Sequence, residues 1–341
     1  MANIEFGCLP TSIGSMPQTD PKSACAQVFH YLKDIPAWPQ LPKRSYNENM
    51  YVQYSQGFPG VVVDNERIYV DRTQAQKELE QFYTDFLADD FNKYAIGAEY
   101  AAGLHTFLSW ENLSPWAVKG QITGPVTWGM TITDENRKAI IYDDTLREAV
   151  PKLLRMKARW MEKALRQISR NTIVFFDEPY MAAFGSVGMM LSRKNVVNLI
   201  NESFEGISGI KGVHCCGNTD WSIMLETTTD IVSFDTYNYA PSLALYPNEV
   251  KRFLEKGGTI AWGIVPMETD ALIGETVASL KDRLEEAMAP FTRSGIPFRQ
   301  LIRQGLITPG CSLAGLGTEE AAGQALELLA ELSAAIRKRY L

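Results

Sequence analysis

Residues 172–179 read TIVFFDEP, a short apolar run that ends in two carboxylates and a proline. Before it, Thr145 to Ser169 carries apolar residues three and four positions apart, which is the period of an amphipathic helix. A helix pattern that leads into a buried-strand pattern is the repeating unit of an α/β fold with a parallel sheet. The same alternation runs through most of the 341 residues, so this unit decides the fold class.

Eight apolar runs are predicted strands. They are Cys8 to Gly14, Ile35 to Leu41, Trp116 to Ile122, Thr172 to Phe176, Ile210 to Val213, Ile231 to Phe234, Thr259 to Gly263 and Leu306 to Thr308. Further predicted helices are Asn195 to Phe204, Asn248 to Lys256, Asp270 to Arg293 and Glu319 to Arg339. Eight strand–helix units predict one (β/α)₈ barrel domain over residues 1–341, and no G-x-G-x-x-G follows a strand to indicate a dinucleotide fold.

Residues 42–115 are too many for one connection between a strand and a helix. We therefore predict an insertion after the second strand. Within it, Val61 to Val70 reads VVVDNERIYV, which predicts a β-hairpin that turns at Asp64 and Asn65. No linker-like segment marks a second domain.

Composition narrows the possible partners and compartment. The net charge of −7 and the absence of a basic stripe argue against nucleic acid. No segment resembles a signal peptide or a membrane span, so we expect a cytoplasmic protein without a membrane partner. Five cysteines at irregular spacing argue against a disulfide framework and for reduced thiols that are available to a metal.

Two distant segments offer metal ligands. Residues 213–219 read VHCCGNT and residues 308–311 read TPGC, each after a predicted strand. The imidazole of His214 with the thiolates of Cys216 and Cys311 suits Zn²⁺, with a fourth position open as in catalytic sites. Any single cysteine is equally well interpreted as a small buried hydrophobe. Cys215 points the opposite way along its strand, which favours packing for that residue.

Other polar residues also follow predicted strands at the barrel mouth, where chemistry occurs in this fold. Ser15 follows the first strand, Thr123 the third, Asp177 the fourth and Asp235 the sixth. A carboxylate at a strand end can also cap the next helix.

These motifs, in this order, carry a resemblance to a known family. Residues 11–19 (TSIGSMPQT), 121–127 (QITGPVT) and 177–179 (DEP), followed by His214, Cys216 and Cys311, resemble the catalytic carboxyl-terminal domain of cobalamin-independent methionine synthase, in a short stand-alone form. Residues 214–219 also resemble a segment of zinc methyltransferases that take methyl groups from corrinoid proteins. Both groups share a superfamily with uroporphyrinogen decarboxylase, which lacks the zinc site.

The resemblance implies a zinc-dependent S-methyltransferase that makes methionine from homocysteine. In that family zinc binds the substrate thiol as a thiolate, which attacks the methyl group. A free thiol with a pKa of about 8.5 is mostly protonated at neutral pH, whereas a metal-bound thiol is deprotonated.

The resemblance also implies roles for individual residues. His214, Cys216 and Cys311 match the zinc ligands, and Asp235 stands where the family has a ligating Glu, so Asp235 either binds zinc or orients His214 or a substrate amine. Asp177 matches the residue that binds the amino group of homocysteine, and Asp177 and Asp235 are the predicted catalytic carboxylates. The predicted substrate-binding residues are Gly14, Ser15, Thr123, Trp128 and Asp177.

The departures from the family concern the methyl donor. Residues 265–268 read VPME and lack the family's catalytic His. The first motif already begins at Thr11, so we expect no counterpart of the family's amino-terminal half. Methyltetrahydrofolate leaves a nitrogen that needs a general acid, whereas a methyl-corrinoid leaves as Co(I) without a proton. We therefore expect a methyl-corrinoid protein as donor, with His105 as the replacement acid if folate is used.

Three alternatives remain open from the sequence. The acceptor can be another small thiol such as coenzyme M. The chain can be a decarboxylase of the uroporphyrinogen type, which should not need His214, Cys216 and Cys311 together. It can also be a metal-binding barrel without catalysis.

Overall fold

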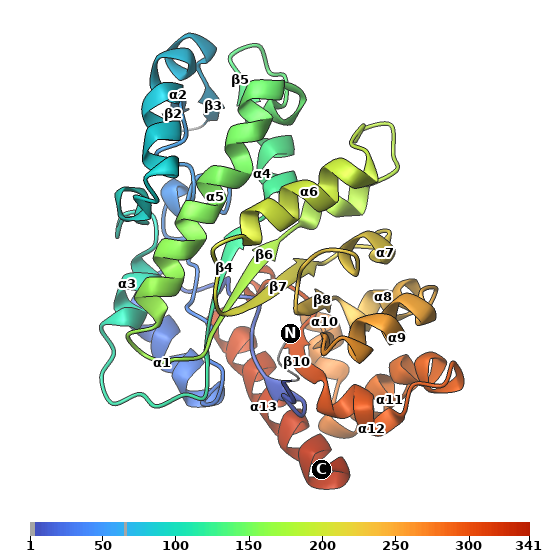
Figure 1. Cartoon of the computed structure of the whole chain (residues 1–341). Coiled ribbons are helices and arrows are strands. Elements are labelled where there is room, and N and C mark those ends of the chain that lie inside the picture. Colours follow the sequence, from blue (N-terminus) through green and yellow to red (C-terminus); the bar gives the residue numbers. More distant parts are fainter. Residues whose placement is uncertain (1–3, 65–66) are drawn as a thin grey trace.

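The computed structural model describes residues 4–64 and 67–341. Seven strands form one curled sheet in the order β1-β10-β9-β8-β7-β6-β4, and every neighbouring pair is parallel (Figure 1). The strands are β1 (Leu9–Pro10), β4 (Val118–Thr123), β6 (Thr172–Asp177), β7 (Ile210–Cys215), β8 (Ile231–Phe234), β9 (Thr259–Val265) and β10 (Gly305–Pro309).

Helices follow the strands and cover the outside of the sheet. They are α1 (Pro21–Tyr31), α4 (Pro125–Thr131), α5 (Asp144–Leu165), α6 (Arg193–Phe204), α7 (Trp221–Met224), α8 (Thr236–Leu243), α9 (Pro247–Glu255), α10 (Thr269–Gly274), α11 (Val277–Arg293), α12 (Phe298–Arg303) and α13 (Glu319–Tyr340). Short 3₁₀ turns are η1 (Tyr46–Glu48), η2 (Phe91–Tyr94), η3 (Ile140–Tyr142), η4 (Pro179–Ala183) and η5 (Leu313–Leu316). In Figure 1, α5 packs across β4 and β6, and α13 lies beside β10.

The second predicted strand, Ile35 to Leu41, is not a strand in the structure. Pro36 and Pro39 have no N–H group and interrupt any hydrogen-bond ladder. The segment instead forms isolated parallel bridges, Ala37 with Lys119 of β4 and Gln40 with Ser15. The structure therefore shows a seven-stranded half-barrel that is compatible with the predicted fold, rather than a closed ring of eight strands.

The predicted insertion contains the predicted hairpin. β2 (Val61–Val63) pairs antiparallel with β3 (Ile68–Val70), and β3 pairs parallel with β5 (Thr133–Asp134), which follows α4. Of the two predicted turn residues, Asp64 is described and Asn65 lies outside the described residues. Two helices complete the insertion, α2 (Arg72–Leu87) and α3 (Ala102–Leu108).

An apolar layer closes the amino-terminal part of the sheet interior. It consists of Phe6, Ile35, Ala117, Ile173, Phe175, Ile231, Ala261 and Leu306. Below it, a cavity of about 640 Å³ is lined by Phe6, Trp116 and the first residues of β6 to β9. This cavity lies at the opposite ends of the strands from the predicted ligands. The size of this cavity therefore does not identify the candidate active site.

Two expectations about the whole chain can be compared with the structure. The five cysteines all lie in the described part of the chain, and none forms a disulfide there. Within residues 4–64 and 67–341, no helix is both long enough and apolar enough to cross a membrane.

Candidate metal centre

His214 lies in β7 with its side chain almost fully buried, and its two ring nitrogens have different surroundings. Nδ1 is 3.0 Å from the hydroxyl oxygen of Ser233, the residue opposite it in β8. Nε2 is buried, and no described group forms a hydrogen bond with it. In metal-binding histidines, one ring nitrogen forms a hydrogen bond that fixes the ring, and the other nitrogen is left to bind the metal. The surroundings of His214 have this arrangement.

Cys216 and Cys311 complete a group of three ligands. One ligand atom from each of His214, Cys216 and Cys311 lies within 4.8 Å of the other two. Cys216 follows β7 and Cys311 follows β10, and β8 and β9 separate these strands, so the curl of the sheet brings the two sulfurs together. The register of β10 shifts between Thr308 and Pro309, just before Cys311. Such irregularities commonly re-aim side chains at sites.

A contact between the two thiols shifts their pKa values in opposite directions. A hydrogen bond from Cys311, together with the nearby His214, lowers the pKa of Cys216 to about 4. The same hydrogen bond, with burial, raises the pKa of Cys311 well above its usual value. One thiolate beside a thiol and an imidazole forms a soft donor set of the kind that zinc prefers. The residues present therefore fit a zinc ion.

Cys215 packs as the alternation along the strand predicts. Its side chain is buried within the hydrophobic core, and its sulfur lies 3.6 Å from the carbonyl oxygen of Gly217. Burial raises the pKa of this thiol to about 12. Cys215 is thus kept as a neutral core residue.

Asp235 caps a helix in the structure. Its carboxylate accepts hydrogen bonds from the backbone N–H of Asn238 at 3.0 Å and from the Asn238 side chain at 2.8 Å, at the start of α8. Burial raises its pKa. It lies beside Gly310, where an added Cβ would come within 2.8 Å of a carboxylate oxygen. Asp235 is not part of the three-residue group, and its role as a zinc ligand stays a prediction.

Asp177 lies at the carboxyl end of β6, opposite Thr123 of β4 and His214 of β7. Its Oδ1 is buried, and no described group forms a hydrogen bond with it. Burial raises its pKa to about 6, against the opposing effect of His214 and Lys119. A buried carboxylate oxygen without a partner, next to the candidate ligands, is available to a cationic group of a ligand.

Glu178, by contrast, is used within the fold. Its carboxylate accepts hydrogen bonds from the backbone N–H groups of Val126 at 2.9 Å and Thr127 at 2.7 Å, at the start of α4. Gly124 makes room for it, because a Cβ there would lie 2.3 Å from the Glu178 carboxylate. The carboxylate of Glu178 therefore caps the first turn of α4.

Gly14 and Ser15 form a turn that is tied to the segment after α1. The Ser15 hydroxyl lies 3.3 Å from Gln40 Oε1, and the Gly14 carbonyl accepts a hydrogen bond from the Gln40 N–H at 3.1 Å. Gly14 has a φ of 140°, and a Cβ there would lie 2.3 Å from the Gln121 side chain. Both features favour glycine at this position. A carboxylate contact at this turn stays a prediction.

Thr123 and Trp128 both anchor the insertion. The Thr123 hydroxyl donates to the carbonyl of Met50 at 2.7 Å, and the Trp128 indole N–H donates to that of Tyr51 at 2.8 Å. Trp128 is fully buried and packs edge-on against Phe58. Because their polar groups already have partners, we do not retain these two residues in the proposed substrate site.

Comparison with known proteins gives fold-level neighbours only. No family model matches the chain, and no curated protein matches its sequence. Two solved structures are similar in part. A B12-independent methionine synthase from Shewanella sp. W3-18-1, in complex with selenomethionine, has 18% identity and a TM-score of 0.47 over 65% of this chain and 63% of that one. A putative vitamin-B12 independent methionine synthase from Listeria monocytogenes has 19% identity and a TM-score of 0.44 over 68% and 69%.

These neighbours bear the family name that the sequence motifs resemble. The chain spans 63% of the length of the first. Structural similarity at this low sequence identity does not indicate an activity. The function proposed below therefore rests on the residues of the site.

A polar network beneath the candidate site was not predicted from the sequence. Gln40 Nε2 donates to Gln53 Oε1 at 2.8 Å and to the Tyr54 hydroxyl at 2.9 Å, and that hydroxyl donates to the carbonyl of Gln121 at 2.7 Å. Lys119 is fully buried on the same strand as Gln121. For β4, the sequence does contain a signal for a polar face, because its polar side chains recur at every second position, at Lys119, Gln121 and Thr123. Gln53 and Tyr54 lie in the insertion, where no pattern singles them out.

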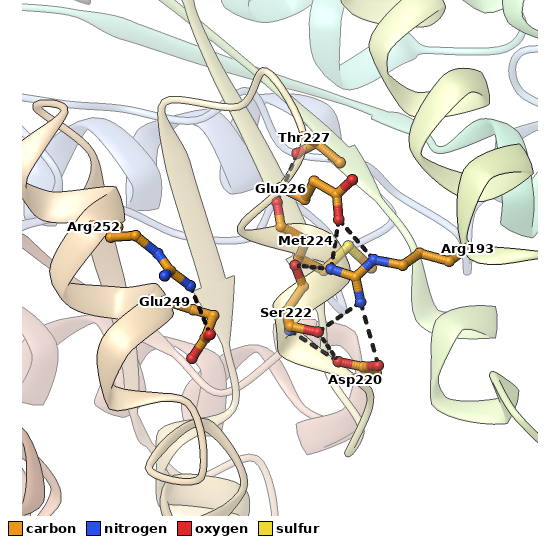
Figure 2. Close-up of polar contacts among 8 residues, drawn as sticks. All are labelled: Arg193, Asp220, Ser222, Met224, Glu226, Thr227, Glu249 and Arg252. Atoms are coloured by element: carbon orange, nitrogen blue, oxygen red, sulfur yellow. Dashed lines mark hydrogen bonds and ion pairs between the residues drawn. The ribbon is translucent and has the colours of Figure 1, made fainter.

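Arg193 fixes the segment after the ligand-bearing strand β7. Figure 2 shows its guanidinium between α6 and α7, where it donates to Glu226 at 2.6 Å and to the Ser222 hydroxyl at 2.8 Å. Asp220, which caps α7, lies 3.7 Å away. A cavity of about 340 Å³ separates this cluster from the Arg252–Glu249 pair on α9. Across it, Arg193 is paired with Glu226 and Arg252 with Glu249.

His105 lies away from the metal centre. Its Nε2 is 2.8 Å from the carbonyl oxygen of Ile96, and its ring lies beside Trp160. Trp160 is near the end of α5, just before the chain enters β6 at Thr172. This position is at the amino-terminal end of the strand, whereas Asp177 is at its carboxyl end. His105 is therefore not placed to act as the replacement acid at the mouth.

Proposed function

We propose that the chain is a zinc-dependent S-methyltransferase that moves a methyl group to the thiolate of homocysteine and makes methionine. The observation that carries the proposal is that His214, Cys216 and Cys311 each place one ligand atom within 4.8 Å of the other two, while the buried Nε2 of His214 has no hydrogen-bond partner among the described groups. A bound zinc ion would supply deprotonation of the acceptor thiol at neutral pH, which generates the nucleophile.

The chain's own residues hold and orient this centre. His214, Cys216 and Cys311 would provide the zinc ligands, and the contact between His214 Nδ1 and Ser233 holds the ring and leaves Nε2 free to bind the metal. Asp235 is proposed as a further ligand or as an orienting group. The three ligands leave a position for the acceptor sulfur, as a catalytic site requires.

The acceptor is proposed to be an amino-acid thiol. Asp177 offers a buried carboxylate oxygen without a partner, directly opposite His214, and an ammonium group would satisfy it. The turn at Gly14 and Ser15 would receive the carboxylate. Coenzyme M has no ammonium group and would leave Asp177 unpaired, so this arrangement favours homocysteine.

A decarboxylase of the uroporphyrinogen type fits the site less well. That chemistry gives no reason for one imidazole and two cysteine sulfurs to converge at the strand ends, which they do here. The predicted single barrel over residues 1–341 also stays a proposal. In it, the segment around Ala37 and Gln40 would stand between β1 and β4 through its two isolated bridges.

A methyl-corrinoid protein remains our proposed donor. The support is the lack of an imidazole acid at the mouth, since the chain has three histidines and, besides His214, His105 lies at the other end of the fold and His30 on the outer helix α1. A corrinoid leaves without needing a proton. The two solved neighbours are named as B12-independent, which describes those proteins.

One assay tests both the reaction and the donor. Zinc-loaded protein is offered homocysteine with either methylcobalamin or methyltetrahydrofolate, and methionine is measured by mass spectrometry. The proposal expects methionine, formed faster from methylcobalamin. Equal or faster turnover with methyltetrahydrofolate would overturn the donor, and no methionine from either donor would overturn the reaction.

A further inference from the structure

Lys119 is a fully buried lysine in the interior of the sheet. Its ammonium group donates to the carbonyl of Ile13 at 2.9 Å and to Gln121 Oε1 at 3.3 Å. It also lies 4.4 Å from the centre of the Phe175 ring, which belongs to the apolar layer below. Lysines are almost never fully buried without compensation, so this charge calls for a physical account.

The first contact of Lys119 points to the proposed acceptor site. Ile13 immediately precedes Gly14 and Ser15, the turn proposed to receive a carboxylate. The other side of this turn is held by Gln40, through its N–H to the Gly14 carbonyl. Lys119 and Gln40 thus fix the turn from two directions, and the only charge among these contacts is the ammonium group.

The second feature is electrostatic. Asp177 is the carboxylate whose charge acts on Lys119, and it lies on the neighbouring strand nearer the mouth. Burial lowers the pKa of Lys119 to about 8, and the charge of Asp177 opposes this lowering. Because this pKa is still above 7, the charged form is favoured at neutral pH. A neutral donor would suffice to hold the Ile13 carbonyl. A charge in a region of low dielectric adds an attraction for an anion at the turn above it.

We propose that Lys119 is a positioning residue that makes the acceptor site selective for a thiol that carries a carboxylate. It holds the Ile13 to Ser15 turn and places a buried positive charge beneath it, while Asp177 receives the ammonium group. The inference rests on the proposed function and names the feature of the acceptor that the site recognises. Lys119 itself does not touch the acceptor.

Ligand binding tests this without a methyl donor. Calorimetry compares the affinity of zinc-loaded protein for methionine and for 3-(methylthio)propylamine, which is methionine without its carboxylate. The unaltered protein should bind methionine at least about tenfold more tightly, the equivalent of one charge-assisted hydrogen bond. Equal affinities in the unaltered protein would overturn the inference.

Variants separate the charge from the packing. Lys119→Met keeps an unbranched side chain only one atom shorter and should weaken methionine binding about tenfold, while the affinity for the amine should stay unchanged. Lys119→Gln keeps a donor for the Ile13 carbonyl but carries no charge. It should lose the same affinity for methionine as Lys119→Met. Lys157→Met is the matched control. Lys157 lies on α5, outside the sheet; it is also fully buried, and its ammonium group donates to the carbonyl of Ala95 at 3.3 Å.

The outcomes distinguish this inference from the proposed function. An equal loss for both ligands, or a similar loss in Lys157→Met, would show a general structural effect and overturn the selective role. If the unaltered protein binds methionine and the loss in Lys119→Met is absent, the inference fails and the proposed function stands. If neither ligand binds to the unaltered protein, the proposed acceptor fails as well.

Discussion

At the scale of single residues, the surroundings of each cysteine and histidine separate ligands from packing. His214 has one nitrogen held by Ser233 and one buried without a partner, and Cys216 and Cys311 each place a sulfur within 4.8 Å of a ligand atom of its ring. Cys215, adjacent to Cys216 in sequence, faces the hydrophobic core. Neighbouring residues of the same type therefore have opposite roles because of strand alternation.

This difference predicts the metal content of cysteine variants. Cys216→Ser and Cys311→Ser should each weaken zinc binding by at least about tenfold, because each removes a thiolate that zinc prefers to a hydroxyl. Cys215→Ser is the matched control and should keep its zinc. Elemental analysis of the purified proteins measures this, and unchanged zinc in either ligand variant would refute the site.

Asp177 predicts an effect on the acceptor rather than on the metal. Asp177→Asn removes the charge that should bind the ammonium group, at a loss of roughly 1.5–3 kcal/mol, so the KM for homocysteine should rise about tenfold or more. Zinc content should stay the same, which controls for damage to the centre. Unchanged homocysteine kinetics would assign the amino group to another residue.

The sequence could single out the candidate ligands because their chemistry and position are both local properties. A histidine and cysteines after apolar runs are visible without knowing the fold, and the parallel sheet then places them on one face. Trp128 was predicted from its place in a motif, and its packing against Phe58 could not be read from that motif. The buried contact of Lys119 with Ile13 spans 106 residues and depends on the curl of the sheet, which no local pattern contains.

At the scale of elements, backbone hydrogen bonding explains where the structure departs from the predicted pattern. Ile35 to Leu41 has the apolar character of a strand, but Pro36 and Pro39 leave it with isolated bridges. The helix starts were better specified, since Asp143 caps α5 through the N–H groups of Thr145 and Leu146. The predicted helix Asp270 to Arg293 is nevertheless two helices, α10 and α11, because Thr276 caps a new helix between them. Side chains that cap helices are local signals, whereas strand pairing is not.

The cap of α4 gives a prediction about stability. Glu178→Ala should lower the free energy of unfolding by roughly 2–4 kcal/mol, because it leaves the buried N–H groups of Val126 and Thr127 without an acceptor. Glu226→Ala, at a half-exposed ion pair with Arg193, should cost about 1 kcal/mol or less. Denaturant unfolding measures both, and similar small losses would contradict the capping role.

Lys157 predicts a pH dependence of stability. Burial lowers its pKa to about 7 in the folded chain, whereas an unfolded lysine has a pKa of about 10.4. Between these values the unfolded chain binds more protons, so the contribution of Lys157 to stability rises with pH from about 7 to about 10. Below about 7 its destabilising effect is constant.

The comparison with Lys157→Met isolates this contribution from other titrating groups. The difference in unfolding free energy between the two proteins should be largest near pH 7, where the variant gains most, and should shrink as the pH rises. A difference that is independent of pH across this window would mean that Lys157 keeps an ordinary pKa.

At the scale of the whole molecule, the curl of the sheet is what creates a centre from distant segments. The candidate ligands lie at the end of β7, directly after β7 and two residues after β10, and two strands separate β7 from β10. The apolar layer around Phe175 closes the interior below, and the insertion, anchored through Thr123 and Trp128, lies beside β4. The fold class followed from the alternation of patterns, but the closeness of ligand atoms is a property of the assembled sheet.

The central claim is that this centre binds the acceptor thiol through zinc. X-ray absorption at the zinc edge of the loaded protein, with and without homocysteine, measures the sulfur atoms around the metal most directly. We expect two sulfur atoms at about 2.3 Å from the zinc ion in the absence of homocysteine, and a third when homocysteine is added. A protein that retains no zinc, or a sulfur count that homocysteine leaves unchanged, would contradict it.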